Sequence, residues 1–220
     1  VLFRRQRQMC IRDRAETFLK LLKEDSPLKI VGTINAYSAL LAKKSGHKAI
    51  YLSGAGVANA SYGLPDLALT SRDNVLEDLR RIKGIVDLPI LVDCDTGWGS
   101  GLNISKTIKE MISAGADAVH LEDQVSEKRC GHRPGKEIVS KEEMVDRIKA
   151  AKDSITKEDF MLMARTDAFS KEGINSVIDR SNAFVEAGAD SIFPEAITKL
   201  EDYYETVSYT HLRAHETSQH

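Results

Sequence analysis

The sequence predicts an α/β fold: a (β/α)8 TIM-type barrel with about six of its eight βα units present. Short β-branched runs alternate with longer amphipathic stretches from about residue 29, which is typical of a parallel sheet with helical crossovers. The turn Gly-Ala-Asp occurs twice, at 115–117 and 188–190, each time before a predicted strand. Each predicted strand from the second onward ends in residues suited to an active site, as barrel strands do.

The six predicted strands are 29–35, 49–54, 90–96, 118–124, 160–167 and 191–196. The clearest helical patterns between them are 72–86, 103–114, 140–152 and 174–187. Gly115 and Gly188 follow two of these helices and suit C-caps. Ser140 followed by Glu143 predicts a capping box. A doubly wound sheet is the alternative, but no GxGxxG turn follows the first strand, so the barrel is favoured.

Composition indicates an ordinary globular protein that acts on a small molecule. The chain has 220 residues, 42% hydrophobic and 29% charged, and contains no apolar run that approaches a membrane span. A formal charge of −2 gives no field that would attract nucleic acid. Three cysteines, Cys10, Cys94 and Cys130, are too few for a disulfide framework or a zinc site. We therefore expect a cytoplasmic protein with neither a nucleic-acid nor a membrane partner.

The two ends of the chain differ from its middle. Residues 1–14 are rich in arginine without helical periodicity, and residues 207–220 are polar and hold three of the six histidines. Neither joins the alternating pattern, so we expect both to be non-native tails. The catalytic barrel domain is then expected at 15–206, stopping short of its last two βα units.

Two aspartates at the end of the third predicted strand indicate a cation site. Asp93 and Asp95 are two residues apart, so a strand places both carboxylates on one face and Cys94 on the other. Mg²⁺ takes one or two carboxylates and keeps several waters, and Glu122 of the next strand can add a third oxygen donor. The alternative is that one aspartate caps the following helix while the other is solvated. Gly97 and Gly99 open the backbone behind the pair and favour the metal.

A cysteine loop follows the fourth predicted strand. Lys128, Arg129, His132 and Arg133 surround Cys130, and Gly131 follows it. Nothing apolar nearby explains a packing role, and a thiol among cations suits proton donation or nucleophilic attack. Cys94, in contrast, is expected to be inert packing.

Further candidate site residues lie at the ends of the other predicted strands. Arg165 offers a fork for a substrate carboxylate, and Glu195 can accept a hydroxyl proton, although the two side chains can also simply pair across the barrel mouth. Ser53, Gly54 and Ala55 supply a hydroxyl and backbone donors for an anionic oxygen, a weak signal alone. Together, the thiol acid, the metal site and the arginine suit retro-aldol cleavage of a substrate with several carboxylates.

Eight segments in order resemble the 2-methylisocitrate lyase family of the isocitrate lyase and phosphoenolpyruvate mutase superfamily. They are LSGAG (52–56), GLPDL (63–67), LVDCDTGWG (91–99), HLEDQ (120–124), KRCGHRP (128–134), VSKEEMVDRIKAA (139–151), ARTDA (164–168) and FPEAI (193–197). The resemblance extends over roughly residues 15–205. KRCGH is specific to the lyase side of the superfamily, and KRCGHRP followed by IVSKEEMVDRI is closer still to the methylisocitrate enzymes.

The resemblance implies Mg²⁺-dependent cleavage of a tricarboxylate to pyruvate and succinate in the methylcitrate cycle of propionate catabolism. It assigns Asp93 and Asp95 to the metal and makes Cys130 the acid that protonates the succinate enediolate. It implies substrate binding by Ser53, Gly54, Ala55, Gly131, Arg165 and Glu195. It places Asp66, Lys128 and His132 along the site, the last two beside the catalytic thiol.

The sequence departs from this family in two respects. Ala55 stands where glycine is frequent, and the segment after the sixth strand, with a substrate loop and two further strands, is absent. Family members are usually homotetramers that exchange a C-terminal helix, so the parent protein is expected to be one. As written, the chain is expected to be unstable and inactive.

Other functions are open on the sequence. A sibling enzyme, such as a dimethylmalate lyase or a carboxyphosphonoenolpyruvate phosphonomutase, has the same fold, but a phosphonomutase needs no thiol acid. A non-catalytic dicarboxylate-binding barrel would need neither Cys130 nor Arg165.

Overall fold

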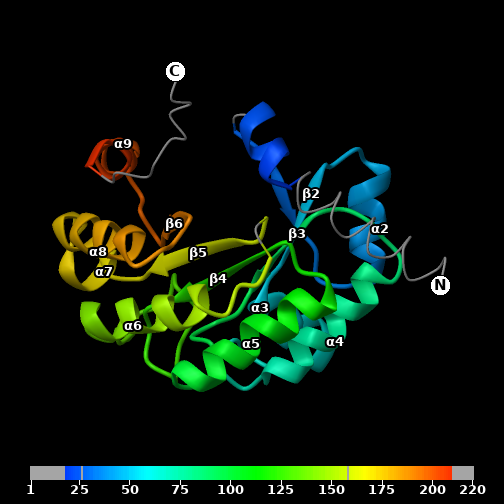
Figure 1. Ribbon diagram of the computed structural model, residues 1–220, viewed down its shortest axis with the longest axis horizontal. Helices are drawn as coiled ribbons and strands as arrows, with labels where there is room; N and C mark the ends of the chain where they lie inside the picture. Colours follow the sequence, from blue (N-terminus) through cyan, green and yellow to red (C-terminus); the bar gives the residue numbers. More distant parts are fainter. Residues whose placement is uncertain (1–17, 26, 158, 210–220) are drawn as a thin grey trace.

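Six parallel strands form one curled sheet in the computed structural model, which describes residues 18–25, 27–157 and 159–209 (Figure 1). The strands are β1 (Ile30–Gly32), β2 (Ala49–Leu52), β3 (Ile90–Asp93), β4 (Ala118–Glu122), β5 (Met161–Thr166) and β6 (Ser191–Pro194). Their order in the sheet is their order in the chain, and every neighbouring pair is parallel. This confirms the predicted barrel-type winding, because the strand order of a doubly wound sheet reverses.

Helices connect the strands, and several of them cover the outer face of the sheet. They are α2 (Ala36–Lys44), α3 (Gly54–Gly56), the π-helix η1 (Val57–Ser61), α4 (Arg72–Lys83), α5 (Gly101–Ala114), α6 (Lys141–Lys152), α7 (Phe169–Glu172), α8 (Ile174–Glu186) and α9 (Leu200–Tyr209), with a further helix at 18–24. The four predicted helical patterns correspond to α4, α5, α6 and α8. None of the helices in the described part of the chain is long and apolar enough to span a bilayer. The predicted tail at 1–14 and most of that at 207–220 lie outside the described residues, although α9 continues to Tyr209.

The predicted helix ends are confirmed in part. Gly115 and Gly188 have φ of 99° and 111°, the left-handed conformation that suits a C-cap. The capping box at α6 is only half formed. The Ser140 hydroxyl accepts from the Glu143 N–H at 3.1 Å, but the Glu143 carboxylate pairs with Arg147 at 2.7 Å one turn on. A charged i,i+4 partner outcompetes the return bond to the cap.

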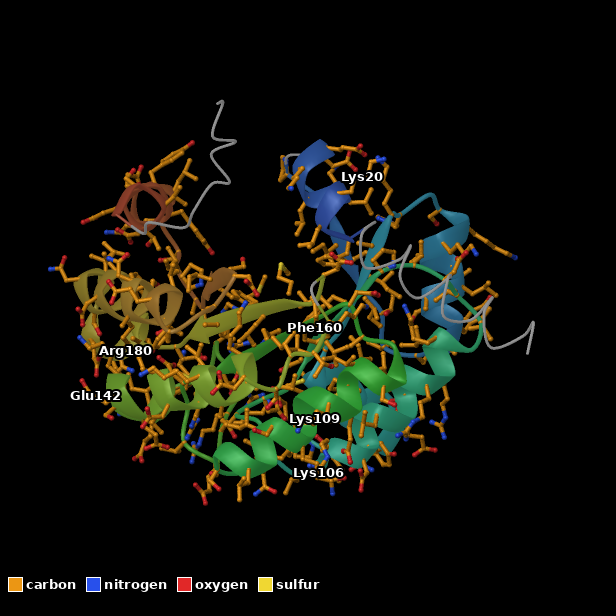
Figure 2. All side chains as sticks on the ribbon, viewed as in Figure 1. Lys20, Lys106, Lys109, Glu142, Phe160 and Arg180 are labelled. Atoms are coloured by element: carbon orange, nitrogen blue, oxygen red, sulfur yellow. The ribbon has the colours of Figure 1, made fainter. Side chains whose placement is uncertain are left out.

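Two hydrophobic layers hold the sheet. The larger fills the space between the strands and helices α4, α5, α6 and α8, and includes Cys94, which is buried as predicted. Figure 2 shows Lys106, Lys109 and Glu142 on the outer side of this helical layer and Phe160 inside it.

The second layer lies on the inner face at the amino end of the strands. Leu91, Ala118 and Met161 are register partners on β3, β4 and β5, and Phe18 of the helix at 18–24 packs on them with no exposed surface. Apolar packing therefore closes this end of the sheet. The polar residues of the inner face lie at the carboxyl end of the strands.

The repeated Gly-Ala-Asp turn builds the same contact twice. Asp117 accepts from the Ile90 N–H at 3.0 Å and pairs with Lys83 at 3.1 Å. In the second copy, Asp190 accepts from the Leu162 N–H at 2.9 Å and pairs with Lys152 at 2.8 Å. Each turn thus ties the end of one helix to the start of a strand at the amino end of the sheet.

Candidate active site

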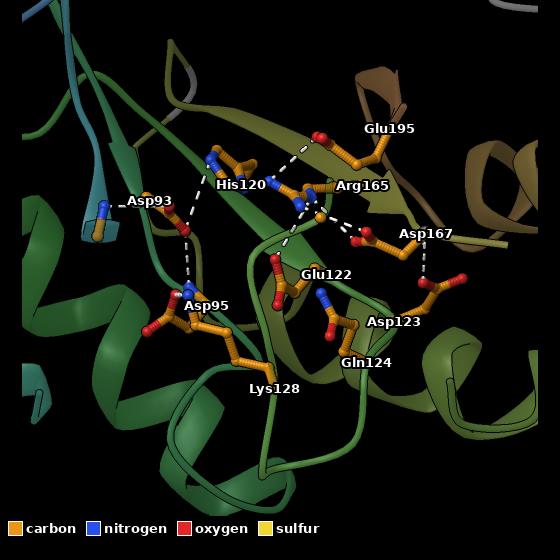
Figure 3. A network of polar contacts seen from close by, with 12 residues as sticks. Asp93, Asp95, His120, Glu122, Asp123, Gln124, Lys128, Arg165, Asp167 and Glu195 are labelled. Carbon is orange, nitrogen blue, oxygen red and sulfur yellow. Dashed lines mark hydrogen bonds and ion pairs between the residues drawn. The ribbon is translucent and has the colours of Figure 1, made fainter. Parts of the chain in front are cut away.

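Asp93, the last residue of β3, is the most heavily contacted carboxylate of the site. It accepts from the Gly54 N–H at 3.1 Å, from the Tyr51 hydroxyl at 3.2 Å and from the Asp95 N–H at 3.0 Å, and its Oδ1 lies 3.6 Å from His120 Nε2 (Figure 3). Burial raises its pKa, but nearby positive charge outweighs burial and brings the pKa to about 2. Asp93 is therefore a fixed anion.

Asp95 lies beside it in a different backbone conformation. Its φ is 45°, so it follows β3 in a left-handed turn rather than extending the strand. Its Oδ1 pairs with Lys128 at 2.8 Å, and Lys128 also binds Asp66. Burial and the neighbouring Asp93 raise the pKa of Asp95 to about 7. The pKa of Asp95 is thus raised, whereas that of Asp93 is lowered.

The space beside Gly54 tests whether this pair suits a metal. A Cβ built on Gly54 would lie 3.0 Å from Asp95 Oδ1 and 3.2 Å from Asp93 Oδ2. Oxygens of both carboxylates thus converge on one point that only a glycine leaves open. Two hard oxygen donors beside open space fit Mg²⁺, which keeps several of its waters.

The place of Glu122 in the metal site stays a prediction. Within the described ranges, no group of three or more His, Cys, Asp or Glu side chains is arranged to hold a metal ion. Glu122 pairs with Arg165 at 3.3 Å, and its buried Oε1 has no hydrogen-bond partner. Burial raises the pKa of Glu122 well above its usual range.

Arg165 on β5 is the centre of the second half of the site. It lies between register partners Glu122 on β4 and Phe193 on β6, with its guanidinium carbon 5.3 Å from the centre of the phenyl ring. It pairs with Asp167 at 3.0 Å and with Glu195 at 3.3 Å. The predicted pairing of Arg165 with Glu195 across the mouth is present, and Figure 3 shows these acidic side chains around one arginine.

The predicted cysteine loop lies against this arginine. A Cβ on Gly131 would lie 2.5 Å from Glu195 Cγ and would overlap Arg165 Nη2, so only glycine fits there. His132 is largely exposed, and its Nε2 lies 3.1 Å from Glu195 Oε1. Cys130 is half-buried. The loop therefore brings Gly131, the residue after Cys130, against the Arg165–Glu195 pair.

Ser53, Gly54 and Ala55 begin the short helix α3. The Ser53 hydroxyl accepts from the Gly56 N–H at 3.3 Å and also forms a side-chain hydrogen bond with Tyr51. The Gly54 N–H is already bonded to Asp93, so it holds the aspartate rather than facing a ligand. Asp66, Lys128 and the aspartate pair connect this region to the cysteine loop.

A cavity of about 330 Å³ opens at the aspartate side of the site. It is lined by Ala68, Asp95, Thr96, Trp98, Gly99, Ser126 and Lys128. Residues in the left-handed region cluster here, with φ of 56° at Ala68 and 55° at Trp98 in addition to Asp95. Backbone strain of this kind concentrates at functional sites.

Three residues of the site were missed by sequence reasoning. Half-buried Tyr51 and fully buried His120 lie beside Asp93, with the Tyr51 oxygen 2.9 Å from His120 Nε2. His120 precedes Glu122 by two residues on β4, so strand spacing could have placed both on the inner face. Lys136 is buried under the cysteine loop and binds Asp167 at 2.8 Å. No sequence signal marks Lys136, because its partner lies 31 residues away.

The family model described as phosphoenolpyruvate phosphomutase matches residues 18–213. The chain is 60% identical over 186 residues to a 2-methylisocitrate lyase of Vibrio cholerae, covering 84% of this chain and 60% of the relative. It is 56% identical over 196 residues to the 2-methylisocitrate lyase of Escherichia coli, covering 89% and 66%. The chain thus spans about three-fifths to two-thirds of the length of these curated relatives.

Solved structures share the fold at lower identity. A 2,3-dimethylmalate lyase superposes with a TM-score of 0.82 at 31% identity, covering 89% of this chain and 66% of that one. An oxaloacetate acetylhydrolase bound to 3,3-difluorooxalacetate gives a TM-score of 0.84 at 33% identity, covering 89% and 67%.

Proposed function

Because the chain belongs to the phosphoenolpyruvate phosphomutase family, we propose that its protein is a Mg²⁺-dependent lyase that cleaves 2-methylisocitrate to pyruvate and succinate. The observation that carries the proposal is that the cysteine loop contacts both the aspartate pair and the Arg165–Glu195 pair. Lys128 of this loop binds Asp95, while Gly131 of the same loop packs on Arg165 and Glu195. These contacts support a single site shared by Cys130, the aspartate pair and the arginine.

The roles follow from charge and position. Mg²⁺ bound at Asp93 and Asp95 would polarise oxygens of the substrate and stabilise developing negative charge. Arg165 offers a guanidinium to a substrate carboxylate, and Glu195 and His132 flank it. As Glu195 accepts the proton of the substrate hydroxyl, the hydroxyl carbon becomes the carbonyl of pyruvate and the carbon–carbon bond breaks, which leaves its electron pair on the succinate fragment as an enediolate. Cys130 donates the proton that converts this fragment to succinate, and the other fragment leaves as pyruvate.

Identity favours this substrate over the sibling activities. The 2-methylisocitrate lyases match at 55–60% identity in four bacteria, whereas the dimethylmalate lyase and oxaloacetate acetylhydrolase structures match at 29–33%. The intact KRCGH segment supports a lyase with a thiol acid. A small tricarboxylate substrate, a cytoplasmic location and a homotetrameric assembly are parts of the same proposal.

The test is a coupled assay on a protein that carries this chain at the full length of its relatives. The product of each acid is followed at equal substrate concentration, with Mg²⁺ and with excess EDTA: pyruvate from 2-methylisocitrate and from dimethylmalate, glyoxylate from isocitrate, and phosphoenolpyruvate or pyruvate from phosphonopyruvate. We expect the highest kcat/KM with 2-methylisocitrate and no turnover in EDTA. A higher kcat/KM with any of the other three acids would replace the proposed substrate.

A further inference from the structure

The cysteine loop is closed at its base by contacts independent of the site. Gln124 and Ile138 form an antiparallel bridge, and the Val125 N–H donates to the Glu137 carbonyl at 3.0 Å. The Gln124 side chain also donates to the Arg129 carbonyl at 2.9 Å and accepts from the Arg129 N–H at 3.0 Å. These contacts fix where the loop leaves and rejoins the fold. They leave the orientation of its tip, Cys130 to His132, to other contacts.

Lys136 supplies such a contact. Its side chain is 3% exposed, and its Nζ donates to the Gly131 carbonyl at 2.5 Å and to Asp167 Oδ1 at 2.8 Å. We propose that Lys136 is a positioning residue that latches the tip of the cysteine loop onto β5, and so holds Cys130 beside Arg165. The catalytic consequence rests on the function proposed above, but the latch itself does not.

The partner of Lys136 is rigidly held. The backbone N–H of Asp167 donates to Asp123 Oδ1 at 2.8 Å, and its carboxylate binds Arg165. Burial alone would raise the pKa of Asp167, but Arg165 and Lys136 outweigh it and the pKa is lowered. One carboxylate thus orients both the substrate-facing arginine and the lysine that holds the loop, so the two are placed relative to each other.

The loop is therefore tied on two sides by lysines of its own. Lys128 reaches Asp95 and Asp66 next to β3, and Lys136 reaches Asp167 after β5. The thiol lies between these two attachments in sequence. Lys136 binds the backbone carbonyl of Gly131. Position 131 has no side chain to bind, because Arg165 and Glu195 leave no room for a Cβ there. A lysine from within the loop can reach that carbonyl without adding bulk to the site.

Proteolysis by an arginine-specific protease tests the latch without reference to catalysis. Arg129 is exposed, and the bond after it lies in the loop, whereas Arg180 is a buried residue of α8 and reports global unfolding. Proteolysis of a transiently opened segment follows the population of its open form. Loss of a hydrogen bond to a charged group shifts such an equilibrium by about tenfold or more. We expect Lys136→Met to speed cleavage after Arg129 by that factor, with cleavage after Arg180 unchanged.

Two further variants keep the test decisive. Lys136→Gln retains a donor for the Gly131 carbonyl but loses the charge, so its cleavage rate should lie between wild type and Lys136→Met. If Lys136→Met does not fold, the cleavage rate of Lys136→Gln decides the test by itself. Lys141→Met is the matched control, since it removes a 2.7 Å ion pair with Asp179 on the surface. Its rate should equal that of wild type. Equal rates in wild type and both Lys136 variants, or equal acceleration after Arg129 and Arg180, would refute the latch.

Turnover gives the second readout. Because Cys130 acts after the carbon–carbon bond breaks, a misplaced loop tip should lower kcat by about tenfold or more and change KM little. A rise in KM alone would overturn the positioning role for the thiol. If the wild-type enzyme does not turn over 2-methylisocitrate, the proposed function fails, and the protease result still decides the latch.

Discussion

The two ends of the sheet carry buried charge in different ways. At the amino end, Lys83–Asp117 and Lys152–Asp190 are two copies of one arrangement, each tying a helix to a strand. Each carboxylate there also accepts a strand N–H, so it is paired on both sides. At the carboxyl end, the charged groups after β3, β4, β5 and β6 differ from strand to strand. They contact one another across strands rather than completing one turn each.

Some buried polar atoms at the carboxyl end also have no hydrogen-bond partner. Glu122 Oε1 and His120 Nδ1 are buried without a hydrogen-bond partner, and Asp95 lies in the left-handed region. Such costs persist in a fold when function requires them. We therefore infer that the charged residues at the amino end stabilise the barrel, whereas those at the carboxyl end are available for catalysis. Substitutions at the carboxyl end should reduce turnover, and substitutions at the amino end should reduce stability.

The largest effect on turnover is expected at Asp93. Asp93→Ala removes the anion that holds Gly54, Tyr51 and the Asp95 backbone, together with half of the proposed Mg²⁺ site. Activity of the full-length enzyme should fall below detection in a pyruvate-release assay. The matched control is Asp190→Ala at the amino end, which should keep normal kcat. Turnover that persists in Asp93→Ala, or in excess EDTA, would show that the aspartate pair does not serve a metal.

The second effect is expected at Cys130. Serine keeps the shape of the side chain but is a far weaker acid, so Cys130→Ser should lower kcat by about 10²–10⁴-fold, the usual contribution of general acid catalysis. Cys94→Ser, in the hydrophobic core, is the contrasting variant and should act on stability instead. Near-normal kcat in Cys130→Ser would exclude the acid role, and a change in KM alone would make Cys130 a binding residue.

The sequence predicted the barrel because its signals are local and repeated. The six strands and the helices α4, α5, α6 and α8 follow from periodicity, and Gly115 and Gly188 mark helix ends by their own backbone preference. The prediction that Asp93 and Asp95 converge also agrees with the structure, although its reasoning was incomplete. β3 ends at Asp93, and a left-handed turn, not strand spacing, directs Asp95 towards Gly54.

Contacts between distant segments could not be predicted in the same way. Lys136 meets Asp167 only because the loop after β4 folds over the end of β5, and no pattern within either segment encodes that distance. Helix α2 was given no bounds from the sequence, although Asn35 and Ser38 form a capping box at its start. Its cap was recognisable, but only two of its residues, Ala39 and Ala42, are buried, so it lacks a strong apolar face.

A smaller effect is expected at Gly131, within the carboxyl end. Gly131→Ala places a methyl group against Glu195 and the Arg165 guanidinium, so the side chains must move. Displacement of about 1 Å in a positioned site costs about 10²-fold in rate. Gly32→Ala on β1 is the matched control, because its Cβ would meet nothing within 4 Å. The measurement is kcat/KM for both variants, with unfolding temperatures to confirm that each is folded. Equal kcat/KM in the two would mean that the loop does not lie against Arg165 during turnover.

The smallest effect on turnover is expected at the amino end, where the two copies of the Gly-Ala-Asp turn differ in exposure. The Lys83 and Asp117 side chains are 9% and 3% exposed, whereas those of Lys152 and Asp190 are 41% and 38% exposed. Removing one partner of a buried pair costs about 3–5 kcal/mol when the charge left behind is uncompensated. Without Lys83, Asp117 would keep Lys157 at 3.7 Å as a more distant partner, so the lower part of this range is expected. An exposed pair contributes only about 0–1 kcal/mol, because water and salt screen it.

Lys83→Met and Lys152→Met therefore measure one contact in two environments. Denaturant unfolding should show a loss of several kcal/mol for Lys83→Met and about 1 kcal/mol or less for Lys152→Met. Both should retain wild-type kcat below their unfolding transitions, because Phe18 and the apolar layer separate this end from the site. Equal losses of stability would show that burial does not set the strength of the repeated contact. A fall in kcat for either variant would break the separation between the two ends of the barrel.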